Sequence, residues 1–164
     1  KEAGKRVDVL IQYFMDYKKR NHDDLKLVLI GGGEIDIPST DIIDLGFVSA
    51  QDKYDAYAAA SLFCNPSQFE SFSLVIMESW LAGTPVLVNG DCEVTRDFVT
   101  RFSGGLYYQN TREFESCVKY ILEHHEIALA MGQNGRIEVK NQFEWAAIVG
   151  KYTAYFQHVE ELTT

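Results

Sequence analysis

Short apolar runs alternate with helical patterns along this chain, and the alternation constrains the fold more than any other feature. A first helix is expected where Val7, Leu10, Ile11 and Phe14 share one face. Three basic residues fall in its last turn, and Asn21 can close it. The runs at 25–30, 42–47, 61–65, 86–88 and 104–108 are expected to be strands, and the first of them is expected to be covered on both faces. Further helices are expected at 53–60, 73–82, 91–100, 111–124, 126–131, 135–141 and 143–159. Strands that alternate with helices predict βαβ units, and therefore an α/β domain with an open parallel sheet.

Length and composition narrow the class of protein. The 164 residues fit a single domain, and no linker or internal repeat divides them. The apolar runs are too short for a membrane span, and the net charge of −9 argues against nucleic acid as a partner. Cys64, Cys92 and Cys117 match neither a disulfide framework nor a zinc pattern, which favours free buried thiols in the cytoplasm. The chain starts at Lys1 without a methionine, so we expect a piece of a longer protein.

Residues 65–86 form the most informative stretch, a loop that leads into a helix and then into a strand. The helix is apolar on nearly every side, which predicts that it is buried. It nevertheless contains Glu78, and a second acid, Glu70, stands in the loop before it. Burying an unpaired carboxylate such as Glu78 is costly. Two acids that flank a helix start suggest a site that holds polar hydroxyls beside an anion. Gly83 is expected to end the helix, and Pro85 to open the next strand.

The strand ends and the start of this helix are expected to share one edge. Ligands of open parallel sheets bind beyond the carboxyl ends of the strands, where Glu70 and the glycine run 31–33 both belong. A helix that starts near Ser73 directs its free N–H groups at this edge and can bind a phosphate. Glu78 is then within reach of whatever is attached to that phosphate. The pattern leaves two roles for Glu78 open: binding a pair of ribose hydroxyls, or pairing with a buried arginine or backbone group.

Other motifs are weaker. The glycine run lacks the spacing of a dinucleotide-binding loop or of a P-loop, and alone it predicts only a turn. Glu34 and Asp36 resemble a pair of metal ligands but lack a third, so no metal site is expected. The four histidines lack metal spacing, and Arg96 and Arg101 are expected on the surface. Trp145, Tyr152 and Phe156 are expected to anchor the last helix by packing.

A longer motif connects these residues to a known family. Glu70 and Glu78 form a Glu-x7-Glu pattern that continues through Phe72-x-Leu74 and Gly83-Thr84-Pro85-Val86. The chain from Lys5 to about Tyr152 resembles the carboxyl-terminal, donor-binding half of a retaining GT-B glycosyltransferase of the GT4 type. The resemblance implies a Rossmann-like parallel sheet with helices on both faces, one half of the GT-B fold. Residues 1–164 would then be a single nucleotide-sugar-binding domain.

The resemblance also implies a function and a site. The full-length enzyme would transfer a hexose from a nucleotide diphosphate sugar, with retention and without a metal or other cofactor. Its acceptor site would lie in an N-terminal domain that these residues do not include, so the fragment alone is expected to be inactive in transfer.

Each site residue carries over by position in the motif. Glu78 would bind the ribose and Glu70 the transferred sugar. Backbone groups near Phe72, Ser73 and Leu74 would bind the diphosphate, while Gly32 and Val48 would lie along the nucleotide and its base. Lys5 fits the lysine of an Arg-x4-Lys pattern and would act with Glu70 in catalysis, although by itself it resembles an ordinary solvated lysine at a helix start. The arginine of that pattern would precede Lys1.

Two serines depart from the family pattern. The motif often has glycine where this chain has Ser71 and Ser73, and serine does not adopt every conformation open to glycine.

Two alternative hypotheses for the function also remain. The domain could be a non-catalytic, flavodoxin-like binding or interaction module, or a metal-dependent sugar transferase that uses Glu34 and Asp36.

Overall fold

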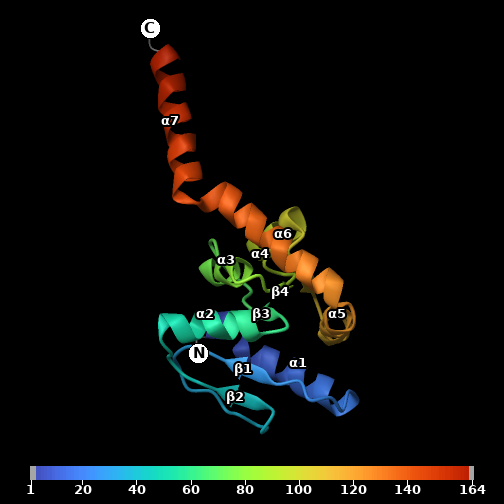
Figure 1. The fold of residues 1–164 in the computed structure, drawn as a ribbon. Coiled ribbons are helices and arrows are strands. Elements are labelled where there is room, and N and C mark those ends of the chain that lie inside the picture. Colours follow the sequence, from blue (N-terminus) through green and yellow to red (C-terminus); the bar gives the residue numbers. More distant parts are fainter. Residues whose placement is uncertain (1–2, 163–164) are drawn as a thin grey trace.

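The computed structural model describes residues 3–162, and Figure 1 shows how their helices and strands are arranged. The first half contains η1 (Ala3–Lys5), α1 (Val7–Arg20), β1 (Leu27–Leu29), β2 (Ile42–Asp44), α2 (Ala50–Ala59) and β3 (Phe63–Asn65). The second half contains α3 (Leu74–Leu81), β4 (Val86–Asn89), α4 (Glu93–Phe102), β5 (Gly105–Tyr108), α5 (Thr111–Glu123), α6 (His125–Phe143) and α7 (Trp145–Leu162). Every expected strand is present, most of them shorter than expected.

All strand pairs are parallel, as the alternation predicts, but the described strands pair in two sheets and not in one. β1 pairs with β2, with Leu27 opposite Ile42. The second sheet has the order β3-β4-β5, with Val86 opposite both Phe63 and Gly105. Parallel strands need crossover connections, and the helices between them provide these. The carboxyl ends of β3, β4 and β5 therefore meet at one edge.

Strand β4 lies at the centre of the core, and all four of its residues are buried. Val86 and Val88 face α3, α4 and α6, where they pack with Trp80 and Phe102. Leu87 points to the opposite face and packs with side chains of α1 and α5. This alternation follows from the two-residue period of a strand. Helices therefore cover both faces of the three-stranded sheet, which confirms the predicted α/β architecture.

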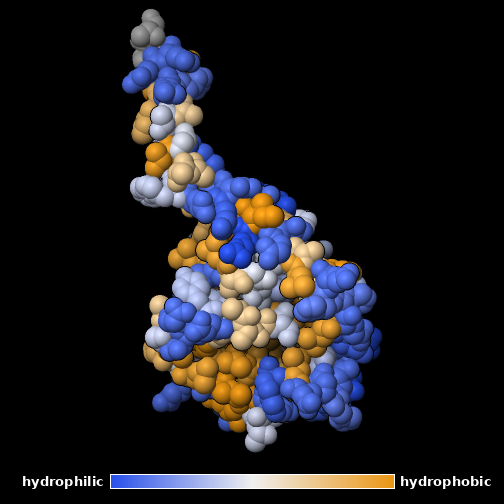
Figure 2. Space-filling view, in the orientation of Figure 1, coloured by the Kyte–Doolittle hydropathy of each residue, from blue (hydrophilic) through white to orange (hydrophobic). Residues whose placement is uncertain are grey.

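Helix α1 covers one face of the two-stranded sheet as well. Ile11 and Phe14 pack there against Leu29 and Ile42. The prediction that residues 25–30 are covered on both faces is wrong, because Val28 is exposed. Ile43, Leu45 and Phe47 are also exposed, and Figure 2 shows apolar atoms gathered in the region where Figure 1 draws β1 and β2.

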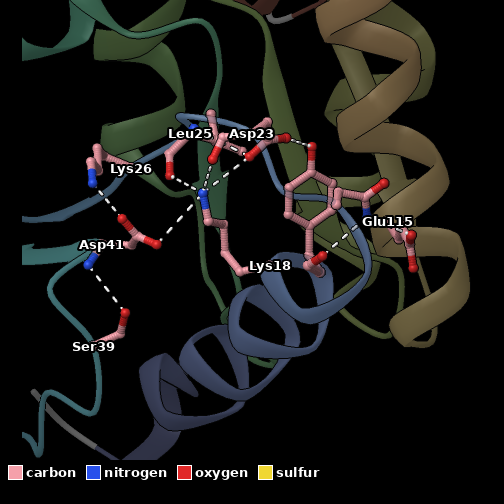
Figure 3. Close-up of polar contacts among 9 residues, drawn as sticks. Lys18, Asp23, Leu25, Lys26, Ser39, Asp41 and Glu115 are labelled. Atoms are coloured by element: carbon pink, nitrogen blue, oxygen red, sulfur yellow. Dashed lines mark hydrogen bonds and ion pairs between the residues drawn. The ribbon is translucent and has the colours of Figure 1, made fainter.

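A polar network fixes the carboxyl end of α1 to the segments that precede β1 and β2 and to α5 (Figure 3). The mostly buried Lys18 ammonium donates to the backbone oxygens of Asp23 and Leu25 and pairs with the carboxylates of Asp23 and Asp41. Glu115 of α5 accepts from the side chains of Arg20 and Asn21, both at 2.7 Å. Asn21 also caps the helix, as its sequence position predicts, because its backbone N–H donates to an α1 carbonyl.

Helix α6 corrects the expectation of two short helices at 126–131 and 135–141. Its two internal glycines do not break it, because both lie where the helix approaches its neighbours closely. A Cβ at Gly132 would lie 1.9 Å from the carbonyl oxygen of Gly83, and one at Gly135 would lie 2.3 Å from the ring of Trp80. Glycine is therefore needed for packing here, and the helix continues through it.

Helix α7 extends away from the strands (Figure 1). The prediction that its aromatic residues are packing anchors is wrong. None of its described residues is buried, and the exposed fraction of Trp145 is 80%. Within residues 3–162, no helix is both long enough and apolar enough to cross a lipid bilayer.

Candidate functional site

The loops that follow β1 and β2 are joined at their backbones. The N–H of Gly31 donates to the carbonyl oxygen of Gly46 at 2.7 Å, and both glycines have positive φ. A Cβ at Gly32 would lie 2.4 Å from the ring of Phe47, so this ring rests on the glycine loop. Because 88% of Phe47 is exposed, its other side faces solvent. The half-buried Val48 follows directly. The expected base-binding segments, Gly32 and Val48, thus stand beside an open aromatic ring.

Lys5 and Glu70 lie 65 residues apart in the sequence and are in contact. The ammonium of Lys5 is 2.8 Å from Oε1 of Glu70, and only 10% of the Glu70 side chain is exposed. Burial raises the pKa of the Glu70 carboxyl, but the hydrogen bonds from Lys5, Ser67 and Asn65 and the charge of Lys5 together lower the pKa by more. Glu70 is therefore ionised at neutral pH. A carboxylate held in this way can accept hydrogen bonds from sugar hydroxyls.

The start of α3 has an unusual backbone. Ser73, the N-cap residue, has φ 69° and ψ 72°, in the left-handed region that favours glycine. Its hydroxyl makes no capping hydrogen bond and accepts instead from the side-chain amide of Asn65 at 2.8 Å. The N–H of Ile76 donates to the carbonyl oxygen of Ser73 at 3.2 Å, but the N-cap side chain supplies no partner for the N–H groups that precede Ile76. These groups can donate to an anion.

Phe72 and Leu74 flank this N-cap and differ in environment. The ring of Phe72 packs edge-to-face on Phe98 and Phe143, which fixes the loop to α4 and α6. Leu74 is exposed, as are Val75 and Leu81. The prediction of a helix buried on nearly every side is therefore wrong. One face of α3 remains open to solvent.

Glu78 is engaged by side chains of α2. Its Oε1 is 2.7 Å from the ammonium of Lys53, and its Oε2 is 3.4 Å from the hydroxyl of Tyr57. The side chains of Glu78 and Lys53 remain 22% and 31% exposed. Burial and the charge of Glu78 raise the pKa of Tyr57, so that hydroxyl stays protonated and can donate. Glu78 thus has the partners that its burial requires, and it also has access to solvent.

The structure adds three residues that the sequence did not predict: Lys53, Tyr57 and Asn65. Lys53 and Tyr57 lie in a helix with little apolar periodicity, so nothing in the local pattern marks them. A signal for Asn65 does exist, because asparagine before proline at a strand end is typical of a side chain that caps a turn. In the structure, Oδ1 of Asn65 accepts from the N–H of Ser67 at 3.0 Å.

Other predicted candidates lie apart from this site. Glu34 and Asp36 are exposed, and within residues 3–162 no three His, Cys, Asp or Glu side chains gather where they could hold a metal ion. Arg101 pairs with Asp97 on the surface, whereas the half-buried Arg96 donates to a backbone oxygen. The arginine expected before Lys1 falls outside the described residues.

Comparisons with known proteins agree with this geometry. A family model described as "Glycosyl transferases group 1" matches residues 1–124. The alpha-1,3/1,6-mannosyltransferase ALG2 of Candida albicans is 29% identical over 114 residues, which cover 65% of this chain and 26% of ALG2.

Solved structures show the same fold. The complex of Anabaena Alr3699/HepE with UDP-glucose has a TM-score of 0.78 at 18% identity, over 96% of this chain and 46% of that one. Sucrose-phosphate synthase from Thermosynechococcus elongatus has a TM-score of 0.75 at 21% identity, over 98% of this chain and 44% of the synthase. The present chain therefore spans less than half the length of these relatives, and the predicted half of a GT-B fold is confirmed.

Proposed function

The chain belongs to the glycosyl transferases group 1 family, and from this membership we propose that residues 1–164 form its nucleotide-sugar-binding domain. The observation that carries the proposal is the contact of Lys5 with Glu70 beside the uncapped start of α3. This contact brings together a cation, an ionised carboxylate and free N–H groups. A sugar attached to a diphosphate needs this combination, because it presents hydroxyls next to an anion.

Each group has a role in donor binding. The N–H groups at Ser73 and Leu74, together with the positive end of the helix dipole, bind the diphosphate. Glu70 accepts hydrogen bonds from the transferred sugar, and Glu78 accepts them from the ribose while Lys53 holds it in place. The base lies along the backbone at Gly32 and Val48. Since the chain has a net charge of −9, local cations and N–H groups are needed to attract an anionic nucleotide sugar.

The same groups support a reaction. When the bond between sugar and diphosphate breaks, negative charge grows on the leaving diphosphate. Lys5 and the N–H groups of α3 are fixed beforehand and stabilise that charge, so the step needs no metal ion. We propose that the longer protein transfers a hexose with retention at the anomeric carbon. ALG2 is a mannosyltransferase and the HepE complex contains UDP-glucose, which supports a hexose donor.

The acceptor site belongs, in this proposal, to an N-terminal domain of the longer protein. The chain spans less than half of its relatives, and the groups described above serve only the donor. The 164 residues alone therefore bind the donor but do not transfer sugar. Sugar transfer by this chain at the rate of the longer enzyme would refute this part. Cys64, Cys92 and Cys117 are free thiols, which supports a cytoplasmic location, but only Cys92 is buried as expected, and Cys64 and Cys117 are half-buried.

Titration calorimetry tests donor binding. The chain is titrated with UDP, GDP, ADP, UDP-glucose and GDP-mannose, in the presence of EDTA. We expect one nucleoside diphosphate to bind, and Glu78→Ala to weaken its binding about 10-fold or more, the equivalent of one hydrogen bond to a charged group. Glu115→Ala is the matched control, because Glu115 is equally enclosed and also paired at 2.7 Å, but with Arg20. If none of the five compounds binds, the proposal is wrong.

One observation favours a second candidate function. The pair of Glu78 with Lys53 is what a non-catalytic, flavodoxin-like module would need if Glu78 had only a structural role. In that case Glu78→Ala would lower stability and leave nucleotide binding unchanged. The same titration separates the two functions.

A further inference from the structure

Asn65 ends β3 and is almost completely enclosed, with 4% of its surface exposed. Both the oxygen and the nitrogen of its side-chain amide make hydrogen bonds. Oδ1 accepts from the N–H of Ser67 at 3.0 Å, while Nδ2 donates to Oγ of Ser73 at 2.8 Å and to Oε1 of Glu70 at 3.5 Å. Because the backbone N–H can only donate, the contact with Ser67 fixes which end of the amide carries the oxygen.

The two acceptors of Nδ2 belong to different halves of the proposed donor site. Glu70 serves the sugar, and Ser73 sets the start of the helix that serves the diphosphate. Ser73 is also strained, since a left-handed backbone costs a residue other than glycine about 1 to 2 kcal/mol. Such strain persists only where the surroundings hold it. The buried amide is the group that holds the Ser73 hydroxyl.

We propose that Asn65 is a positioning residue of the donor site, whose single buried amide orients both the Glu70 carboxylate and the left-handed backbone of Ser73. The assignment of Glu70 to the sugar and of Ser73 to the diphosphate rests on the proposed function. The hydrogen bonds that link these two residues through Asn65 do not rest on it. Asn65 orders both halves before a donor arrives. This lowers the cost of binding, because groups that are already ordered lose less freedom.

The neighbouring strand supplies a matched control. Asn89 ends β4, is also 4% exposed, and accepts through Oδ1 from the N–H two residues ahead at 3.0 Å. Its Nδ2 donates to the backbone oxygen of Pro66 at 3.2 Å, not to Glu70 or Ser73. Truncating either asparagine removes a buried amide of equal exposure. Only Asn65 is linked to both halves of the site.

Nuclear magnetic resonance on the ligand-free chain tests the proposal without any assumption about the donor. Two quantities are measured: the pKa of the Glu70 carboxyl, from its side-chain carbon shift, and the backbone conformation at residue 73, from the coupling between its amide and α protons. In Asn65→Ala we expect the pKa of Glu70 to rise toward 4.5, and residue 73 to leave the left-handed region. In Asn89→Ala we expect both quantities to stay at their wild-type values.

A rescue separates positioning from general loss of stability. In Asn65→Ala/Ser73→Gly, residue 73 returns to the left-handed region, because glycine adopts it without strain. The pKa of Glu70 stays raised. Where Asn65→Ala does not fold, Asn65→Ser replaces it, since a serine oxygen can still accept from the N–H two residues ahead. The proposal is overturned if truncating Asn65 changes neither quantity, or if Asn89→Ala changes both by the same amount.

Loss of nucleotide binding and loss of this coupling are independent results. A chain that binds none of the five titrated compounds refutes the proposed function and leaves the ligand-free measurements as they are. A chain that binds a nucleotide, but in which Asn65→Ala alters neither Glu70 nor residue 73, keeps the proposed function and refutes the role of Asn65.

Discussion

The backbone at the mouth of α3 can be tested by exchanging Ser73 for alanine and for glycine. Both substitutions remove the hydroxyl and its hydrogen bond to Asn65, so they differ only in the Cβ atom. At φ 69° that atom costs up to about 1 to 2 kcal/mol. An alanine that relaxes out of the left-handed region, as expected for residue 73 in Asn65→Ala, exchanges part of this strain for a distorted start of α3. In the opposite direction, glycine lowers the free energy of unfolding by about 0.4 to 1 kcal/mol relative to alanine, because it gives the unfolded chain more conformational freedom. Ser73→Gly is therefore expected to be more stable than Ser73→Ala by about 0.5 to 1 kcal/mol.

Ser71 gives the same comparison without the strain. It lies two residues earlier in the same loop, is exposed, and is not among the described residues with positive φ. Here the unfolded-state term acts alone, so Ser71→Ala is expected to be more stable than Ser71→Gly by about 0.4 to 1 kcal/mol. The order of alanine and glycine thus reverses between two serines of one motif.

Urea denaturation of the four variants measures both differences. The midpoint is compared at constant slope, where a slope of about 1 to 3 kcal/mol per molar urea makes a change of 0.5 kcal/mol detectable. In thermal melts, 1 kcal/mol corresponds to about 2 to 4 °C for a chain of this size. If Ser73→Ala is at least as stable as Ser73→Gly, the left-handed backbone at the site is wrong, and so is the account of the helix start.

Three further predictions concern packing, charge and pH. Gly132→Ala is expected to destabilise the fold by about 1 to 3 kcal/mol, because its Cβ would overlap a backbone carbonyl oxygen. Gly150→Ala has open space around its Cβ and is expected to stabilise α7 by up to about 1 kcal/mol. Denaturation that ranks the two variants the other way contradicts the packing of α6. Lys18→Met is expected to cost about 1 to 3 kcal/mol, since it leaves enclosed oxygens without their cation, and an unchanged denaturation midpoint would contradict the network of Figure 3. Lys5→Met is expected to raise the pKa of Glu70, and the loss of stability that it causes should shrink as the pH falls below about 4.5. A carboxyl group whose pKa is lowered in the folded state stabilises the fold above the pKa of the unfolded state, and it stops doing so once it is protonated. A loss of stability that is constant from pH 7 to pH 3 would refute the ion pair.

Local patterns predicted the elements whose residues interact with near neighbours in the sequence. The strand at 86–88, opened by Pro85, and the end of the first helix at Asn21 follow from spacing and side-chain chemistry alone, and the structure confirms both. The two internal glycines of α6 suggested a break, because the backbones that approach them come from elsewhere in the chain. The aromatic residues of α7 suggested packing anchors, yet none of its described residues is buried.

The candidate site divides in the same way. Its two acids were predicted from a motif within one stretch of sequence. Their partners were not predicted, since Lys53 comes 25 residues before Glu78 and contacts it only because α2 packs beside α3. The strain at Ser73 was foreseen only as a departure from glycine, and the buried amide of Asn65 that holds its hydroxyl became visible in the structure.

One measurement tests the central claim most directly: the affinity of the chain for whichever of UDP, GDP and ADP binds best, compared with the 2′,3′-dideoxy form of the same nucleotide. If Glu78 binds the ribose, removal of the hydroxyls weakens binding to the wild-type chain about 10-fold or more and has little effect on Glu78→Ala. An equal penalty in both proteins would contradict the account, because the ribose would then be bound by other groups.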